Sequence, residues 1–96
     1  MSQHAITRES DGHKGAFVID RDGARLATMT YTTAGDDVII IDHTEVSDTL
    51  RGTGAGKALV TAAVEWARAE HKHVMPLCPF AKAIFDKTPD FADVRR

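Results

Sequence analysis

The sequence predicts a single α+β domain with a mixed, mostly antiparallel sheet and the element order β-β-β-β-α-β-α. The chain has 96 residues, enough for one hydrophobic core, so we expect one domain over residues 1–96. The first half alternates short apolar segments with turn residues, and the second half places an amphipathic helix between two strand-like segments. The second arrangement is typical of a crossover that adds one parallel strand pair.

The first three strands are short and are separated by tight turns. Asp11-Gly12 and Arg21-Asp22-Gly23 supply the turns, since an Asp-Gly pair tolerates positive φ. In the third strand Ala27, Met29 and Tyr31 alternate with threonines, which places these three side chains on one face. The expected strands are Ala5–Glu9, Ala16–Asp20 and Arg25–Thr33.

A longer strand is expected over Val38–Val46. Its first four residues, Val38-Ile39-Ile40-Ile41, are apolar on both faces, a pattern typical of a central strand covered on two sides. We therefore expect helices on both faces of the sheet.

Two helices and a last strand follow. Over Ala55–Glu70, apolar residues recur at three- and four-residue steps, which predicts an amphipathic helix. His73–Leu77 predicts the last strand, and Pro79–Lys87 predicts a shorter helix because proline fits the first helical position. The tail beyond Pro89 is expected to be irregular, with Phe91 docked on the core.

The segment that leads into the first helix carries three alternating glycines, Gly52, Gly54 and Gly56. Glycines leave backbone N–H groups accessible, and the start of a helix attracts anions through its free N–H groups and its dipole. These features indicate an anion-binding loop, and a pyrophosphate is its natural ligand.

Two better-known phosphate loops are excluded by spacing. A Walker A loop requires Ser or Thr after Gly56-Lys57, where this chain has Ala58. The dinucleotide fingerprint requires its last glycine at a position that is occupied by Lys57 or Leu59, depending on where the motif begins.

Three short motifs occur in order around this loop. They are His43-Thr44-Glu45-Val46, Arg51-x-x-Gly54-x-Gly56 and Leu77-Cys78-Pro79-Phe80. Together they resemble the GCN5-related N-acetyltransferase superfamily, in particular its small, minimal branch, whose acyl-coenzyme A loop reads Q/R-x-x-G-x-G/A. The resemblance covers roughly Asp37–Phe85. It implies an enzyme that transfers an acetyl group from acetyl-coenzyme A to an amine acceptor.

The resemblance also implies which residues bind coenzyme A. In the family, the strand before the loop holds the thioester through its backbone, and two splayed parallel strands admit the pantetheine arm. Here these segments are Thr44–Val46 and Val74–Leu77. Lys57 also fits the solvent-facing stripe of the helix. The expected coenzyme A-binding residues are Val46, Arg51, Gly52, Thr53, Gly54, Ala55, Gly56 and Lys57.

Direct attack of an amine on the acetyl group requires a base, an oxyanion donor and an acid for the departing thiolate. His43 and Glu45 share one strand face, so His43 is a candidate base, and Glu45 either orients it or is itself the base. Cys78 precedes Pro79 and is expected to cap the last helix, where the helix dipole favours a thiolate. It is a candidate acid or acetyl-accepting nucleophile, or else a small core residue.

The chain departs from larger family members in two respects. Those members often carry a tyrosine in the last helix as the acid, whereas this chain has Phe80. The helices that form much of the acceptor site are missing, because only Ser10–His13 separates the first two strands, so we expect a shallow acceptor pocket. Two alternatives therefore stay open: a non-catalytic coenzyme A-binding or protein-interaction module, and an acyl-coenzyme A hydrolase that depends on Cys78.

Composition argues against several other classes. Twelve Lys+Arg against fourteen Asp+Glu give a net charge of −2, which disfavours nucleic acid and anionic membranes as partners. A single cysteine excludes an internal disulfide, and His71-x-His73 lacks a third ligand, so no metal is expected. The sequence shows neither a signal-peptide pattern nor an apolar run of membrane length, which favours a cytoplasmic protein. The oligomeric state is left open.

Overall fold

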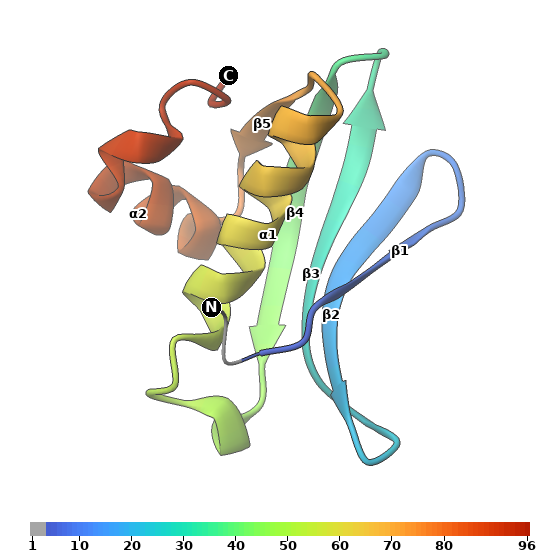
Figure 1. Ribbon diagram of the computed structural model, residues 1–96, viewed down its shortest axis with the longest axis vertical. Helices are drawn as coiled ribbons and strands as arrows, with labels where there is room; N and C mark the ends of the chain where they lie inside the picture. The colour runs from blue at the N-terminus through green and yellow to red at the C-terminus, as the bar shows by residue number, and fades with distance from the viewer. Residues whose placement is uncertain (1–3) are drawn as a thin grey trace.

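The computed structural model describes residues 4–96 and confirms the predicted element order. One layer is a five-stranded sheet, and two helices form the other layer (Figure 1). The first strand begins later than the predicted Ala5–Glu9, and the other bounds differ by a few residues at most. The elements are β1 Thr7–Ser10, β2 Lys14–Arg21, β3 Ala24–Ala34, β4 Val38–Val46, the 3-10 turn η1 Asp48–Leu50, α1 Ala55–Ala69, β5 His73–Pro76, α2 Pro79–Lys87 and the 3-10 turn η2 Pro89–Phe91.

The strands lie side by side in their order along the chain. The pairs among β1, β2, β3 and β4 are antiparallel, and β4 pairs with β5 in parallel, as the crossover predicts. A bulge interrupts β4 where it meets β3: Thr30 lies opposite His43, whereas Tyr31 lies opposite Ile41. Asp42 is therefore the extra residue of the bulge.

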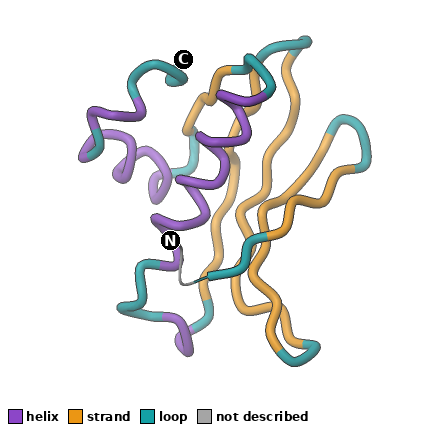
Figure 2. Tube along the Cα trace, viewed as in Figure 1, coloured by secondary structure: helices purple, strands orange, loops and turns teal. Residues whose placement is uncertain are grey.

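Both helices cover the same face of the sheet (Figure 2). Buried residues of α1 and α2, such as Leu59 and Phe85, form one cluster with the inward-facing residues of the strands. The prediction that the apolar run of β4 is covered on both faces is wrong. Ile39 and Ile41 are 0% exposed, whereas Val38 and Ile40 point to the other face and are only partly buried.

The second half of the chain follows the prediction closely. α1 ends at Ala69, one residue before the expected end, and Cys78 is the N-cap of α2 with Pro79 as its first residue. Phe91 is buried as expected and packs edge-on against Phe85, with ring centroids 5.6 Å apart. Within residues 4–96 no helix combines the length and the apolar character that a membrane crossing requires.

Candidate functional site

The parallel strands β4 and β5 pair along only part of β4. Their last paired residues are Ile41 and Pro76, and the N–H groups of Leu77 and Cys78 both donate to the Ile41 carbonyl, at 3.1 and 3.0 Å. Beyond this point β4 continues to Val46, whereas the other chain segment turns into α2. The two strands therefore diverge towards the loop that precedes α1.

A pocket of about 300 Å³ lies between the end of β4, the loop and the start of α2. Every predicted coenzyme A-binding residue except Thr53 lines it. The Thr53 hydroxyl instead donates to the Leu50 carbonyl at 2.5 Å, within the loop. Ser47, Leu50 and Phe80 complete the lining, and Phe80 reaches it from α2. Ser47 and Leu50 are neighbours of predicted residues in the sequence but carry no feature of the loop motif, and Phe80 comes from a distant segment that no local pattern connects to the loop.

The three loop glycines are required for two different reasons. Gly52 and Gly54 both have a φ of +78°, in the left-handed region that residues with a side chain rarely adopt. Gly56 lies in the first turn of α1, where a Cβ atom would overlap the ring of Phe80. The shape of the loop thus requires the first two glycines, and the close approach of α2 requires the third.

The first turn of α1 presents free backbone N–H groups. Ala58 donates the first hydrogen bond of the helix, to the Gly54 carbonyl at 2.9 Å, so the N–H groups of the three preceding residues stand outside the helical ladder. This turn contains no acidic residue, and the helix dipole adds positive potential there. Arg51 pairs with Asp48 at 2.8 Å, but the two side chains are 82% and 88% exposed, so this ion pair is weak and an anion can displace it. The start of α1 and Arg51 therefore give this pocket the chemistry of an anion site.

Cys78 lies on the helix-covered side of β4. Its thiol donates to the Thr44 hydroxyl at 3.4 Å, and the residue is 6% exposed. Thr44 pairs opposite Met29, which is 0% exposed, so Thr44 points to the face that carries the core. The thiol is thus held beside the part of β4 that has no pairing with β5.

His43 and Glu45 lie on the opposite, uncovered face of β4. His43 Nε2 and Glu45 Oε1 are 2.9 Å apart, and the two side chains are 64% and 76% exposed. The bulge adds Asp42 to this face, where its carboxylate accepts hydrogen bonds from Thr30 and Thr32. Asp42 could not be assigned to this face from the sequence, because a bulge breaks the two-residue alternation from which faces are assigned.

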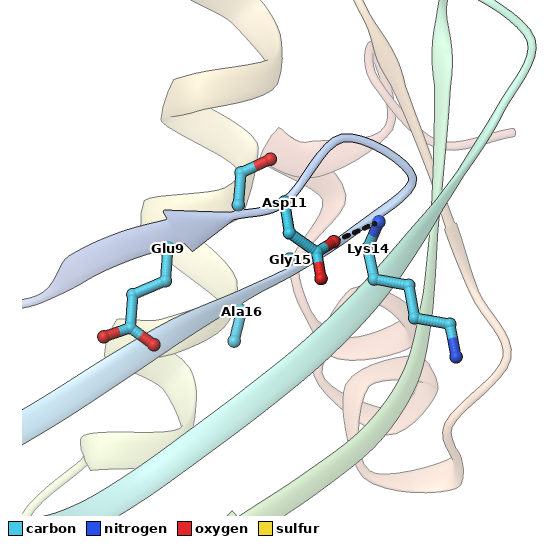
Figure 3. Close-up of a pocket in the computed structure, with 6 residues that line it drawn as sticks. Glu9, Asp11, Lys14, Gly15 and Ala16 are labelled. Carbon is cyan, nitrogen blue, oxygen red and sulfur yellow. Dashed lines mark hydrogen bonds between the residues drawn. The ribbon is translucent and has the colours of Figure 1, made fainter.

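A second hollow, of about 320 Å³, lies at the β1–β2 hairpin (Figure 3). Asp11 accepts the backbone N–H of Lys14 there at 3.3 Å, and the carboxylate of Glu9 pairs with Arg25 at 2.8 Å. No predicted site residue lines this hollow, and its two carboxylates disfavour a phosphate. Within the described residues 4–96, no three His, Cys, Asp or Glu side chains are placed to hold a metal ion.

Comparison with known proteins gives matches along most of the chain. The profile of the GCN5-related N-acetyl-transferase family matches residues 16–94. A GCN5-like candidate N-acetyltransferase from Staphylococcus aureus, solved by NMR, is 38% identical with a TM-score of 0.74, and the match covers 100% of this chain and 91% of that one. The comparison with curated proteins returned no match.

Two more distant solved structures share the fold. The ribosomal-protein-alanine N-acetyltransferase from Brucella melitensis biovar Abortus 2308 is 20% identical with a TM-score of 0.63, covering 80% of this chain and 62% of that one. The aminoglycoside N-acetyltransferase AAC(6')-Iy, solved in complex with coenzyme A, is 17% identical with a TM-score of 0.57, covering 80% of this chain and 67% of that one.

Proposed function

The chain belongs to the GCN5-related N-acetyltransferase family, which makes it an acyltransferase, and we propose that it transfers acetyl from acetyl-coenzyme A to an amine. The observation that carries the proposal is the pocket at the start of α1, which is lined by the glycine loop, the end of β4 and Phe80. The more distant aminoglycoside acetyltransferase was solved with coenzyme A, which supports the same ligand here.

The chemistry of the pocket lining suits the diphosphate of coenzyme A. The N–H groups of Ala55, Gly56 and Lys57 are free to donate to phosphate oxygens, as at other anion-binding helix N-termini. Arg51 and Lys57 both line the pocket and bring positive charge to it. We propose that the pantetheine arm then follows β4 from Val46 towards Thr44, where the strand has backbone groups that β5 does not use.

The positions of the candidate catalytic groups on the two faces of β4 support a division of roles. On this proposal the amine approaches from the uncovered face, where His43 or Glu45 removes its proton. The amine nitrogen bonds to the acetyl carbon, the carbon–sulfur bond breaks, and the thiolate takes a proton from Cys78 on the covered face. The low exposure of Cys78 and its hydrogen bond to Thr44 favour an acid over a nucleophile.

Coenzyme A binding is tested by thermal unfolding of matched variants at position 54. Free coenzyme A at 100 times its dissociation constant adds about 2.7 kcal/mol, which raises the Tm of a domain of this size by roughly ten degrees or more. Gly54→Asn and Gly54→Asp impose the same strain at φ +78°, but only Asp brings a negative charge to the diphosphate. We expect the Tm shift to survive largely in the Asn variant and to vanish in the Asp variant. No shift in the wild type at millimolar coenzyme A contradicts the proposal.

Transfer is tested by mixing the protein with acetyl-coenzyme A and three amines: a polyamine, a peptide α-amine and a lysine-containing peptide. We expect one of them to be acetylated, with no acetyl thioester left on Cys78 in the intact mass. A stable adduct on Cys78 instead assigns it the nucleophilic role. Release of acetate without an amine indicates the hydrolase, and binding with neither reaction indicates a non-catalytic module.

A further inference from the structure

His4 is distant from the glycine loop in the sequence but is buried against it in the fold. The side chain is 7% exposed, and its Nε2 lies 3.2 Å from the carbonyl oxygen of Thr53. On its other side, Nδ1 lies 3.3 Å from Nη2 of Arg21 in β2. The His4–Thr53 contact joins residues 49 positions apart in the sequence.

Two contacts of His4 are satisfied together by one tautomer. The guanidinium of Arg21 can only donate hydrogen bonds, so Nδ1 must be the acceptor. The Thr53 carbonyl can only accept, so Nε2 must carry the hydrogen. One neutral tautomer of His4 satisfies both contacts, and it donates to the loop.

The loop needs such a contact because Thr53 stands between two glycines. Gly52 and Gly54 flank it, both at φ +78°, and residues 51–54 are exposed. Glycine loses more conformational freedom on ordering than any other residue, so this segment is costly to hold in one shape. The N–H and the hydroxyl of Thr53 both bond to the Leu50 carbonyl, at 3.1 and 2.5 Å, which closes a turn within the loop itself. Leu50 anchors one end of this turn in the core, and His4 adds a contact from the N-terminal segment to the exposed part of the loop, at Thr53.

We infer that His4 is a positioning residue for the diphosphate site: it holds the Thr53 carbonyl so that Gly54 and the first turn of α1 keep the geometry that binds phosphate oxygens. The inference rests on the proposed coenzyme A site. His4 does not line the pocket and touches no reacting group. His4 keeps the loop ordered in the ligand-free protein. A loop that is already ordered binds its ligand more tightly, because less conformational entropy is lost on binding.

The test uses two substitutions that separate hydrogen bonding from packing. His4→Gln keeps an N–H donor for the Thr53 carbonyl, whereas His4→Phe keeps a buried ring and removes the donor. His13→Ala is the matched control, because His13 is exposed in the β1–β2 turn and bonds Thr33. Each full-length protein is labelled with nitrogen-15 for backbone relaxation, and coenzyme A affinity is measured by calorimetry.

We expect His4→Phe to lower the order parameter of the Gly54 amide from about 0.85 to below about 0.6. The Kd for coenzyme A should rise about fivefold, as expected for the loss of one hydrogen bond, with kcat at saturating acetyl-coenzyme A unchanged. His4→Gln and His13→Ala should retain the wild-type order parameter and Kd.

The opposite pattern, with Phe tolerated and Gln disruptive, overturns the inference and shows that His4 only fills space. Unchanged order at Gly54 in all variants overturns it as well. If the wild type does not bind coenzyme A, the proposed function fails, and the relaxation measurement still decides whether His4 orders the loop.

Discussion

Gly56→Ala is expected to separate binding from stability in this domain. Gly56 is in the first turn of α1, and a Cβ atom added there would overlap the tip of the Phe80 ring. Phe80 is 45% exposed, so its ring can swing towards solvent instead of forcing the two helices apart. The substitution therefore displaces a wall of the pocket while the core stays in place.

The opposing contributions to stability nearly cancel. Replacing glycine by alanine in a helix contributes up to about 1 kcal/mol. Swinging out a half-buried phenylalanine loses about half of the roughly 1.5–3 kcal/mol that full burial of such a side chain provides. The free energy of unfolding should therefore change by less than about 1 kcal/mol. The new methyl group crowds the ligand, and overpacking of about 1–3 kcal/mol weakens coenzyme A binding about fivefold or more.

The assay is a double-mutant cycle with Phe80→Ala, followed by urea unfolding and by calorimetry with coenzyme A. In the Phe80→Ala background the overlap is absent, so Gly56→Ala should stabilise the protein by about 1 kcal/mol. A loss of more than about 3 kcal/mol in both backgrounds refutes the reasoning, because the clash would then involve the backbone. Unchanged affinity in Gly56→Ala refutes the expectation that the contact between Gly56 and Phe80 shapes the ligand site.

Three further outcomes follow from the same contacts. Gly15→Ala should destabilise the fold by about 1–3 kcal/mol in urea unfolding. The added Cβ would overlap the ring of Tyr31, which is 2% exposed and has no room to move. An unchanged unfolding midpoint contradicts this prediction. Cys78→Ser should lower kcat at least tenfold and leave the Kd for coenzyme A within about twofold, because Cys78 lies outside the proposed phosphate site at the start of α1. Equal losses in both would assign Cys78 to binding. The Arg68 guanidinium holds the pKa of Asp93 below its usual value by donating hydrogen bonds to its carboxylate. The stability that this pair contributes is therefore fully present at neutral pH, and it is lost as the pH falls from about 4 through the lowered pKa. Asp93→Asn should flatten the fall of Tm over that acid range, and an unaltered profile contradicts the pairing.

The glycine loop could be predicted because its chemistry is local. Alternating glycines, an arginine three residues before Gly54 and an amphipathic helix behind them predict an anion-binding loop without long-range information. The structure puts these residues around one pocket, apart from Thr53, whose side chain bonds inside the loop. Cys78 as the N-cap of α2 was equally local, since Pro79 fixes where the helix begins.

The features that were missed depend on contacts between distant segments. The apolar run of β4 suggested that both faces of the sheet are covered. Hydrophobic residues do not by themselves show whether a second layer of helices is present, and Val38 and Ile40 lie partly exposed. The bulge at Asp42 and the burial of His4 against Thr53 likewise arise from pairing and packing across the fold. The requirement for glycine at position 56 also depends on a long-range contact, because Phe80 packs against it only in the folded structure.

The proposed coenzyme A site lies at the start of α1 and along the end of β4. The most direct measurement is a titration of the nitrogen-15-labelled protein with coenzyme A, followed by amide chemical shifts. The largest changes are expected at Gly54, Ala55, Gly56 and Lys57, with a second group from Thr44 to Val46. Changes that instead gather at the β1–β2 hairpin, or no changes at millimolar coenzyme A, contradict the account.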